Sequence, residues 1–162
     1  MFKVADEQTS RSNAPKVNFN IEIKSTELDE KNGYQPTVSS FCDLVMKLIQ
    51  EHALESRCTI QSFDVRVLNY VHQQFPKQNL AYLVENNADY TAALTLLNFT
   101  PNIYSCDFNL LSKSMVDDLH KKSIKVIPWT VNESKDIRNS IALKVDGIIS
   151  DYPNRVIEIL NE

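Results

Sequence analysis

The first regular pattern in the chain is an alternation of apolar and polar residues. Val17-Asn18-Phe19-Asn20-Ile21-Glu22-Ile23 repeats with a period of two, which is typical of a β-strand that buries one face. A polar loop follows over residues 26–35, and Pro36 suits the first turn of a helix. Beyond it, apolar residues recur at the spacing of an amphipathic helix, at Phe41, Leu44, Val45, Leu48 and Ile49.

The same strand-then-helix order recurs five more times. The patterns predict strands over 58–63, 79–84, 102–105, 124–129 and 146–150, and helices over 65–75, 88–97, 112–122, 133–143 and 153–160. Successive strands begin 21, 23, 22 and 22 residues apart. A steady period of this length is typical of βα units, which form a parallel sheet.

Two parallel architectures fit this order, an open doubly wound sheet and a (β/α)8 barrel. Polar residues gather at or just beyond the carboxyl end of each of the six predicted strands, from Glu22 and Lys24 at the first to Ser150 and Asp151 at the last. An open sheet concentrates its site at one switch point, whereas a barrel builds its site from all its βα loops. We therefore predict a TIM-type barrel with about six of its eight βα units over residues 17–162. Residues 1–16 are predicted to be a polar segment with one short helix.

Composition removes several classes of function. The 162 residues include only two glycines, Gly33 and Gly147, so no glycine-rich nucleotide loop can form. The net charge of −4 argues against a nucleic-acid partner, and we read the basic stretch over 120–125 as a helix end.

Cysteine usage and the absence of long apolar runs bear on the redox state and the compartment of the chain. Cys42, Cys58 and Cys106 form no CxxC pair, so we expect buried, reduced thiols and no zinc site. No run approaches 18 apolar residues, and the first residues lack the apolar core of a secretory signal. We expect a cytoplasmic chain as it stands, or a periplasmic or extracellular one if a longer parent carries a signal.

The first strand carries candidate chemistry on one face. Asn20, Glu22 and Lys24 alternate with Phe19, Ile21 and Ile23, so the polar residues would face a barrel interior if the apolar face packs beneath helices. A carboxylate in that position needs a cation or a paired charge. The alternative, a solvent-facing edge strand with an ordinary Glu–Lys pair, stays open on these residues alone.

The last two strands end in further candidates. Trp129 and Asn132 could wall a ligand pocket, or could be a core tryptophan and a helix N-cap. Asp151 could cap the last helix or face the site. The three histidines, His52, His72 and His120, all fall in predicted helices or at their ends, which does not favour a catalytic base.

Four motifs in order resemble one known family. These are Asn20-Ile21-Glu22-Ile23-Lys24, Gln61-Ser62-Phe63-Asp64, Trp129-Thr130-Val131-Asn132 and the run from Asp146 to Pro153. Together they resemble the carboxyl-terminal two-thirds of the glycerophosphodiester phosphodiesterase family, over about residues 17–160. Two positions depart from the family pattern: Ser123 stands where glycine is frequent, and Cys106 where proline is common.

The resemblance implies a fold, a reaction and a set of roles. It implies a TIM barrel that hydrolyses glycerophosphodiesters to an alcohol and glycerol 3-phosphate with a divalent cation, calcium or magnesium. Glu22 would be a metal ligand, Lys24 would meet the phosphate, and Trp129 with Phe63 would wall the glycerol pocket. A hard cation prefers carboxylate oxygen and can neutralise a phosphodiester.

Other elements of the family pattern are absent from this sequence. The family's His-Arg-Gly, Glu-x-Asp and His-Asp motifs have no counterpart here, which leaves no catalytic histidine and one of three metal carboxylates. We therefore expect the chain alone to be inactive, with a homo-oligomer or a complementing amino-terminal fragment as its partner. The alternative is a non-catalytic glycerophosphate- or cation-binding scaffold derived from the same barrel.

Overall fold

The computed structural model describes residues 2–86 and 89–162. Within them, the strands are β1 (Phe19–Glu22), β2 (Cys58–Ser62), β3 (Asn79–Val84), β4 (Ile103–Cys106) and β5 (Lys125–Val126). The helices are α1 (Phe2–Arg11), α2 (Glu27–Lys31), α3 (Val38–Glu51), α4 (Val65–Gln74), α5 (Tyr90–Leu94), α6 (Lys113–Lys121), α7 (Ser134–Ala142) and α8 (Pro153–Leu160). Single 3₁₀ turns lie at Glu55–Arg57 and Phe108–Leu110.

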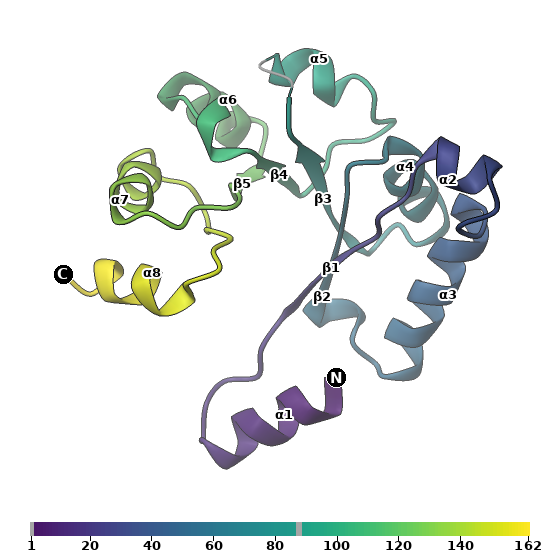
Figure 1. Cartoon of the computed structure of the whole chain (residues 1–162), viewed down its shortest axis with the longest axis horizontal. Helices are drawn as coiled ribbons and strands as arrows, with labels where there is room; N and C mark the ends of the chain where they lie inside the picture. The colour runs from purple at the N-terminus through teal and green to yellow at the C-terminus, as the bar shows by residue number, and fades with distance from the viewer. Residues whose placement is uncertain (1, 87–88) are drawn as a thin grey trace.

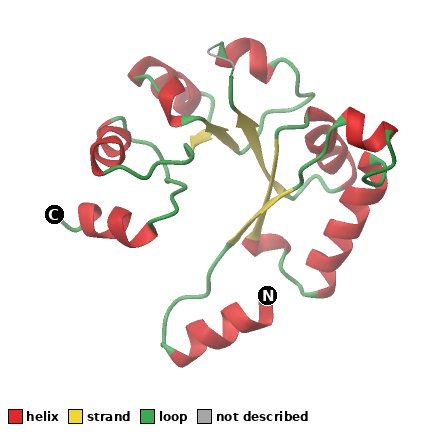
Figure 2. Cartoon of the chain, viewed as in Figure 1, coloured by secondary structure: helices red, strands yellow, loops and turns green. Residues whose placement is uncertain are grey.

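The strands form one parallel sheet in the order β1-β2-β3-β4-β5. Helices α3 to α8 follow one another in an arc around the strands, with the short α2 beside α3 and α4, and the arc is open between α8 and α1 (Figures 1 and 2). Neighbours in sequence are therefore neighbours in space, as in a barrel. The strand-then-helix prediction is confirmed for five units; helix 88–97 begins outside the described residues, and its described part is α5.

The sixth predicted strand, 146–150, is an extended segment and not a regular strand. Its backbone donates from Asp146 to the Val126 carbonyl at 2.8 Å and from Ile149 to the Pro128 carbonyl at 2.9 Å. The backbone of 126–128 donates no hydrogen bond to the backbone of this segment. The Val126 N–H donates to the Asp146 carboxylate instead, at 2.7 Å, and Pro128 has no N–H. The missing donors explain why the prediction of a strand here was wrong.

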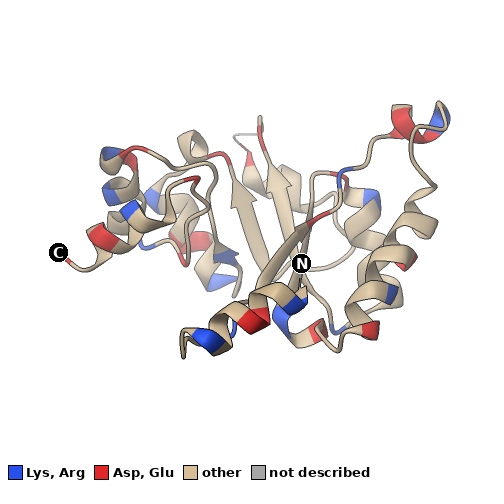
Figure 3. Cartoon of the chain, turned by 60° about the horizontal axis from the view of Figure 1, so that its bottom comes forward, with Lys and Arg blue, Asp and Glu red and all other residues tan. Residues whose placement is uncertain are grey.

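The apolar core lies between the sheet and the helix arc. In β2 the side chains of Cys58, Ile60 and Ser62 are buried, while those of Thr59 and Gln61 are partly exposed, which is the alternation of a strand with one covered face. Charged residues lie mainly on the helices and at strand ends (Figure 3). The largest fully buried side chains include Ile23, Met46, Ile60, Leu68, Tyr104, Leu119 and Ile137.

Helix α1 is longer than the short helix expected within residues 1–16. The ring of Phe2 meets Phe19 of β1 edge to face at 4.8 Å, and Arg57 forms an ion pair with Asp6 at 2.6 Å. The Arg57 guanidinium also donates to the Val17 carbonyl. These contacts attach α1 to the amino-terminal end of β1, and the domain boundary at residue 17 stays a prediction.

All three cysteines are buried and free of disulfides. Burial raises the pKa of the Cys42 and Cys106 thiols to about 12, so both are protonated at neutral pH. Among the helices of the described residues, none has the length and apolar character needed to cross a membrane.

The departure at Ser123 has a backbone explanation. Ser123 follows α6 with a φ of +60°, the left-handed conformation that glycine adopts without cost. Ser123 therefore adopts the backbone conformation that a glycine would adopt at this turn.

Candidate active site

The carboxyl ends of the parallel strands meet at one edge of the sheet, and the candidate site lies there. Glu22 pairs in register with Gln61, and the Ile23 N–H donates to the Gln61 carbonyl at 2.9 Å. One residue further along, the Ser62 hydroxyl donates to the Ile23 carbonyl, so the two strands stay side by side as they leave the sheet. The first two motifs of the family pattern thus meet at one place.

An aromatic pair joins this edge to the far side of the sheet. The rings of Phe63 and Trp129 meet edge to face, with centroids 5.5 Å apart and planes at 84°. Phe63 follows β2 and Trp129 follows β5, so two strands separate them, about 14 Å across a flat sheet. The two side chains lean toward each other across part of this distance, and the arc of helices around the strands in Figure 1 shows that the sheet also curls, as a barrel wall does.

Successive side chains of the Gln61-Ser62-Phe63-Asp64 motif point to opposite faces of the sheet. Ser62 is fully buried; its hydroxyl donates to the Ile23 carbonyl at 2.7 Å and accepts from the Asp64 N–H at 3.1 Å. Gln61 points to the open side, where its amide oxygen accepts from Asn20 at 2.7 Å. Phe63, 44% exposed, is the residue of this motif that is presented at the rim.

Asp64, the last residue of the motif, is the N-cap of α4. Its carboxylate accepts from the Arg66 N–H at 2.9 Å and pairs with the Arg66 guanidinium at 2.7 Å. Burial disfavours the ionised carboxylate, but these bonds outweigh it and hold the pKa of Asp64 below its usual range. The Asp64 carboxylate therefore stabilises the start of α4 and pairs with Arg66.

Trp129 is held in place by its backbone and by its ring. Its N–H donates to the Cys106 carbonyl at 3.0 Å, and its indole Nε1 donates to the Ser105 carbonyl at 2.9 Å. The side chain is half-buried, so Trp129 is not a core tryptophan. The structure brings it together with Phe63, as the resemblance implied.

Asn132 has a role that the sequence did not suggest. The N-cap position of α7 is Glu133, and Asn132 instead donates to the Asp151 carboxylate at 2.8 Å and accepts from the Ser150 hydroxyl at 3.1 Å. Arg155 donates to the Asn132 carbonyl. Asn132 and Asp151 therefore join the two loops before α7 and α8, and neither caps a helix.

Glu22 and Lys24 lie at the carboxyl end of the first strand, and their roles stay predictions. Glu22 is the last residue of β1, an edge strand of the described sheet, and Lys24 lies two residues beyond it; their charged atoms are 4.0 Å apart, with side chains 26% and 82% exposed. A Glu–Lys pair on an edge strand is thus present, and so is a carboxylate at the rim of the curled sheet.

A divalent cation finds only part of its ligand set here. Calcium takes about six to eight oxygen ligands, of which Glu22 would provide one carboxylate. Within residues 2–86 and 89–162, no group of three His, Cys, Asp or Glu side chains could hold a metal ion. The fit to a cation is therefore partial, and further ligands would have to come from elsewhere.

The histidines lie away from the site. His72 stacks on Phe99 at 4.1 Å between ring centroids, and His120 Nε2 is 2.8 Å from the Asp146 carboxylate. His52 follows α3 and packs against Phe2. All three sit at the carboxyl ends of helices, which in a parallel βα fold is the end opposite the candidate site.

A strongly curled parallel sheet, covered on its outer side by helices and polar at its carboxyl edge, defines a portion of a TIM-type barrel. The sequence model of the glycerophosphoryl diester phosphodiesterase family matches residues 3–155, so the chain belongs to this family. The glycerophosphodiester phosphodiesterase of Bacillus altitudinis is 32% identical over 122 residues, covering 73% of this chain and 49% of that protein.

Solved structures agree on the fold. A glycerophosphoryl diester phosphodiesterase homologue from Silicibacter pomeroyi superimposes with a TM-score of 0.80 at 25% identity, over 98% of this chain and 55% of that one. An Oleispira antarctica phosphodiesterase in complex with the product sn-glycerol-3-phosphate superimposes with a TM-score of 0.74 at 16% identity, over 96% of this chain and 59% of that one. The chain spans about half the length of the relatives it matches.

Proposed function

We propose that this chain supplies the glycerophosphate-binding side of a metal-dependent phosphodiesterase that cleaves glycerophosphodiesters to an alcohol and glycerol 3-phosphate. The observation that carries the proposal is the Phe63–Trp129 contact at the carboxyl edge, with Glu22 and Lys24 at the same edge. Family membership gives the reaction class. The product found in the Oleispira antarctica relative gives the ligand that we assign to this edge.

Each residue has a role that its chemistry suits. The exposed Lys24 ammonium would meet the phosphate, since a charge-assisted hydrogen bond to phosphate is short and strong. Phe63 and Trp129 would pack against the carbon skeleton of the glycerol, and Glu22 would give one oxygen ligand to calcium or magnesium. Such a cation neutralises the developing charge on the phosphoryl oxygens.

Under this proposal, we expect the chain alone to hydrolyse little or no substrate. The three histidines are far from the edge, and positioned acid–base groups contribute about 10²–10⁴-fold to a rate. An assay of glycerophosphocholine hydrolysis with calcium or magnesium should give no rate above an EDTA control. A cation-dependent rate that is lost in Glu22→Gln would contradict inactivity while supporting the site.

A second candidate is a binding or scaffolding protein that keeps the ligand site without catalysis. The separation of an assembled aromatic pair from every histidine favours it. The two candidates differ when the remainder of a barrel is added, either by a complementing polypeptide or by a second copy of the chain. The first predicts turnover of the assembled complex, and the second predicts ligand binding with no turnover.

Calorimetry with glycerol 3-phosphate tests the binding role shared by both candidates. Saturable heat at millimolar ligand is expected, and Lys24→Met should weaken binding by about tenfold or more, since one charge-assisted bond contributes more than about 1.4 kcal/mol. Lys47→Met on the outer face of α3 is the matched control, because it removes a similarly exposed ammonium, on a side chain 73% exposed against 82% for Lys24, away from the site. Absence of heat from the unaltered chain overturns the binding role.

A further inference from the structure

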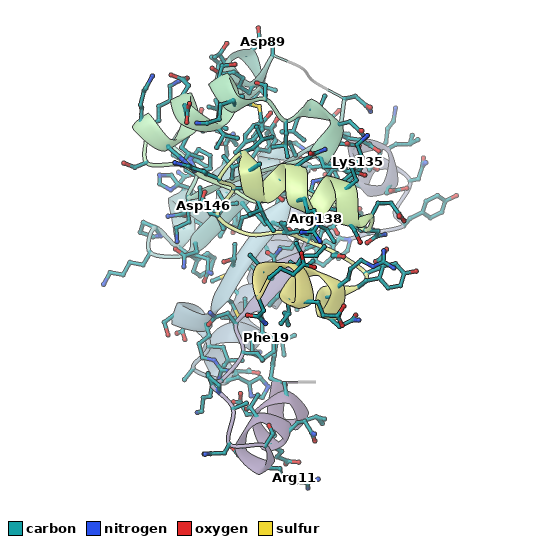
Figure 4. All side chains as sticks on the ribbon, turned by 90° about the vertical axis from the view of Figure 1, so that its left-hand side faces the viewer. Arg11, Phe19, Asp89, Lys135, Arg138 and Asp146 are labelled. Carbon is teal, nitrogen blue, oxygen red and sulfur yellow. The ribbon has the colours of Figure 1, made fainter. Side chains whose placement is uncertain are left out.

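Two amide side chains, Asn20 of β1 and Gln61 of β2, lie on the concave face of the sheet just below the proposed ligand edge. Phe19, labelled in Figure 4, precedes Asn20 and packs its ring against Phe2 of α1, on the side that faces the helices. Because successive side chains of a strand alternate, Asn20 points to the concave side. Gln61 points to the same side and is in register with Glu22. Neither amide is assigned a role in the function proposed above.

Gln61 is the polar side chain next to the aromatic pair. Phe63 follows it by two residues, so the two side chains leave the chain on the same face, about 7 Å apart along the strand. A glycerol unit packed against Phe63 and Trp129 has hydroxyl groups that the rings cannot satisfy. Phe63 has no polar atom, and the indole N–H of Trp129 already donates to the Ser105 carbonyl at 2.9 Å. Gln61 is therefore the side chain of β2 that can reach such a hydroxyl.

Asn20 determines which side of the Gln61 amide is presented to a ligand. Its Nδ2 donates to Gln61 Oε1 at 2.7 Å. The oxygen and the nitrogen of an amide point to different sides, so the NH2 group of Gln61 faces away from Asn20. On that side, the residue in register across the sheet is Ala81 of β3, whose methyl group offers no acceptor. Gln61 therefore presents two N–H donors, and not its carbonyl oxygen, to the concave side.

We propose that Gln61 is a specificity-determining residue that donates a hydrogen bond to a hydroxyl oxygen of the glycerol unit, and that Asn20 is the positioning residue that orients its amide. This inference rests on the proposed function, because it takes the glycerol to lie against Phe63 and Trp129. A site that hydrogen-bonds a substrate hydroxyl discriminates against an analogue that lacks it. The ligand class is therefore a phosphate ester of a polyol, and a simple alkyl phosphate binds less tightly.

Titration with two ligands tests the role of Gln61. Glycerol 3-phosphate and n-propyl phosphate share the phosphate and the length of the carbon chain, and differ in the hydroxyl groups. The unaltered chain should bind glycerol 3-phosphate about fivefold more tightly, the effect of one neutral hydrogen bond at a partly exposed side chain. Gln61→Met keeps the length of the side chain and removes both donors. It should lower the affinity for glycerol 3-phosphate about fivefold and leave that for propyl phosphate unchanged.

A double-mutant cycle tests the role of Asn20. Asn20→Leu removes the donor to Gln61 Oε1, so the amide can turn, and the affinity for glycerol 3-phosphate should fall about threefold. The same substitution in the Gln61→Met background should have no further effect, because Asn20 acts through Gln61. A merely structural role of Asn20 would lower the affinity for both ligands in both backgrounds. Thr59→Val is the matched control, since it alters a concave polar residue in register with Asn20 and should change neither affinity.

Each outcome decides the proposal. Equal losses for the two ligands in Gln61→Met overturn it, because Gln61 would then act on the phosphate or on the fold; no loss for either ligand overturns it as well. Additive effects of Asn20→Leu and Gln61→Met overturn the positioning role. Unchanged binding of propyl phosphate and unchanged urea midpoints show that the variants keep the rest of the site. Equal affinity of the unaltered chain for both ligands overturns this inference alone, whereas binding of neither ligand overturns the proposed function with it.

Discussion

The two faces of the sheet carry alternate residues of the same strands and have different environments. On the helix-covered face, Ile60 and Tyr104 are fully buried among apolar side chains. On the concave face, Asn20 pairs with Gln61, and Phe63 meets Trp129 at the rim. Burial of apolar area stabilises the fold, whereas the rim residues stay accessible to a ligand. The comparison teaches that one strand can hold the core together through every second residue while the residues between remain available for binding.

The largest expected effect is at Ile60. Ile60→Ala should lower the free energy of unfolding by about 2–5 kcal/mol, because it removes fully buried methyl groups and leaves a cavity. Gln61→Ala, one residue later on the concave face, should change it by about 0.5 kcal/mol or less. Urea unfolding of both variants measures the contrast. Similar losses at the two positions would contradict the assignment of faces.

Ser62 should come next. Ser62→Ala leaves the Ile23 carbonyl and the Asp64 N–H without their partner inside the protein, at a cost of about 1–3 kcal/mol. Because this hydroxyl joins the ends of β1 and β2, hydrogen exchange of the Ile23 and Asp64 amides should also speed up. Unchanged stability with unchanged exchange would show that Ser62 does not join the strands.

Asp64 should contribute in a pH-dependent way. Asp64→Ala should cost about 1 kcal/mol at pH 7, because α4 loses its cap. The pKa of Asp64 is lowered in the folded state, so its contribution is present above the unfolded value near about pH 4 and is lost as the pH falls through the lowered value. Unfolding curves from pH 7 to pH 2 should therefore converge for wild type and variant at the acid end. A constant gap across this range would exclude ionised Asp64 as the cause.

Phe63 should have the smallest effect on stability and a clear effect on binding. Phe63→Ala removes a half-exposed ring, so the free energy of unfolding should fall by about 1 kcal/mol or less. Affinity for glycerol 3-phosphate should fall several-fold in calorimetry. Leu44→Ala, which trims an exposed apolar side chain on α3, should leave binding unchanged. Equal affinity of Phe63→Ala and wild type would remove Phe63 from the site.

The regular features of the fold could be predicted because they are periodic. The strand spacing near 22 residues and the polar residues at strand ends led to a parallel barrel portion, which the family match and the solved relatives confirm. The resemblance singled out Phe63 and Trp129, and the structure shows their contact. Binding by Glu22 and Lys24 stays a prediction.

The features that sequence reasoning missed depend on contacts between distant residues. The failure of 146–150 to form a strand follows from Pro128 and from the Asp146 side chain, which together leave β5 without free donors. Asn132 looked like a helix cap, yet its partners are 18 and 19 residues away. A polar residue shows its hydrogen-bonding capacity in the sequence, but its partner is set by the fold.

Trp129 makes the most direct test convenient, since it is the chain's single tryptophan and lies at the candidate site. Its fluorescence can be followed while glycerol 3-phosphate is added to the unaltered chain, to Lys24→Met and to Lys47→Met. The account predicts a saturable change in emission for the unaltered chain and for Lys47→Met, with the midpoint for Lys24→Met raised about tenfold or more. No change up to millimolar ligand, or the same midpoint in all three proteins, would contradict a glycerophosphate site at this edge of the sheet.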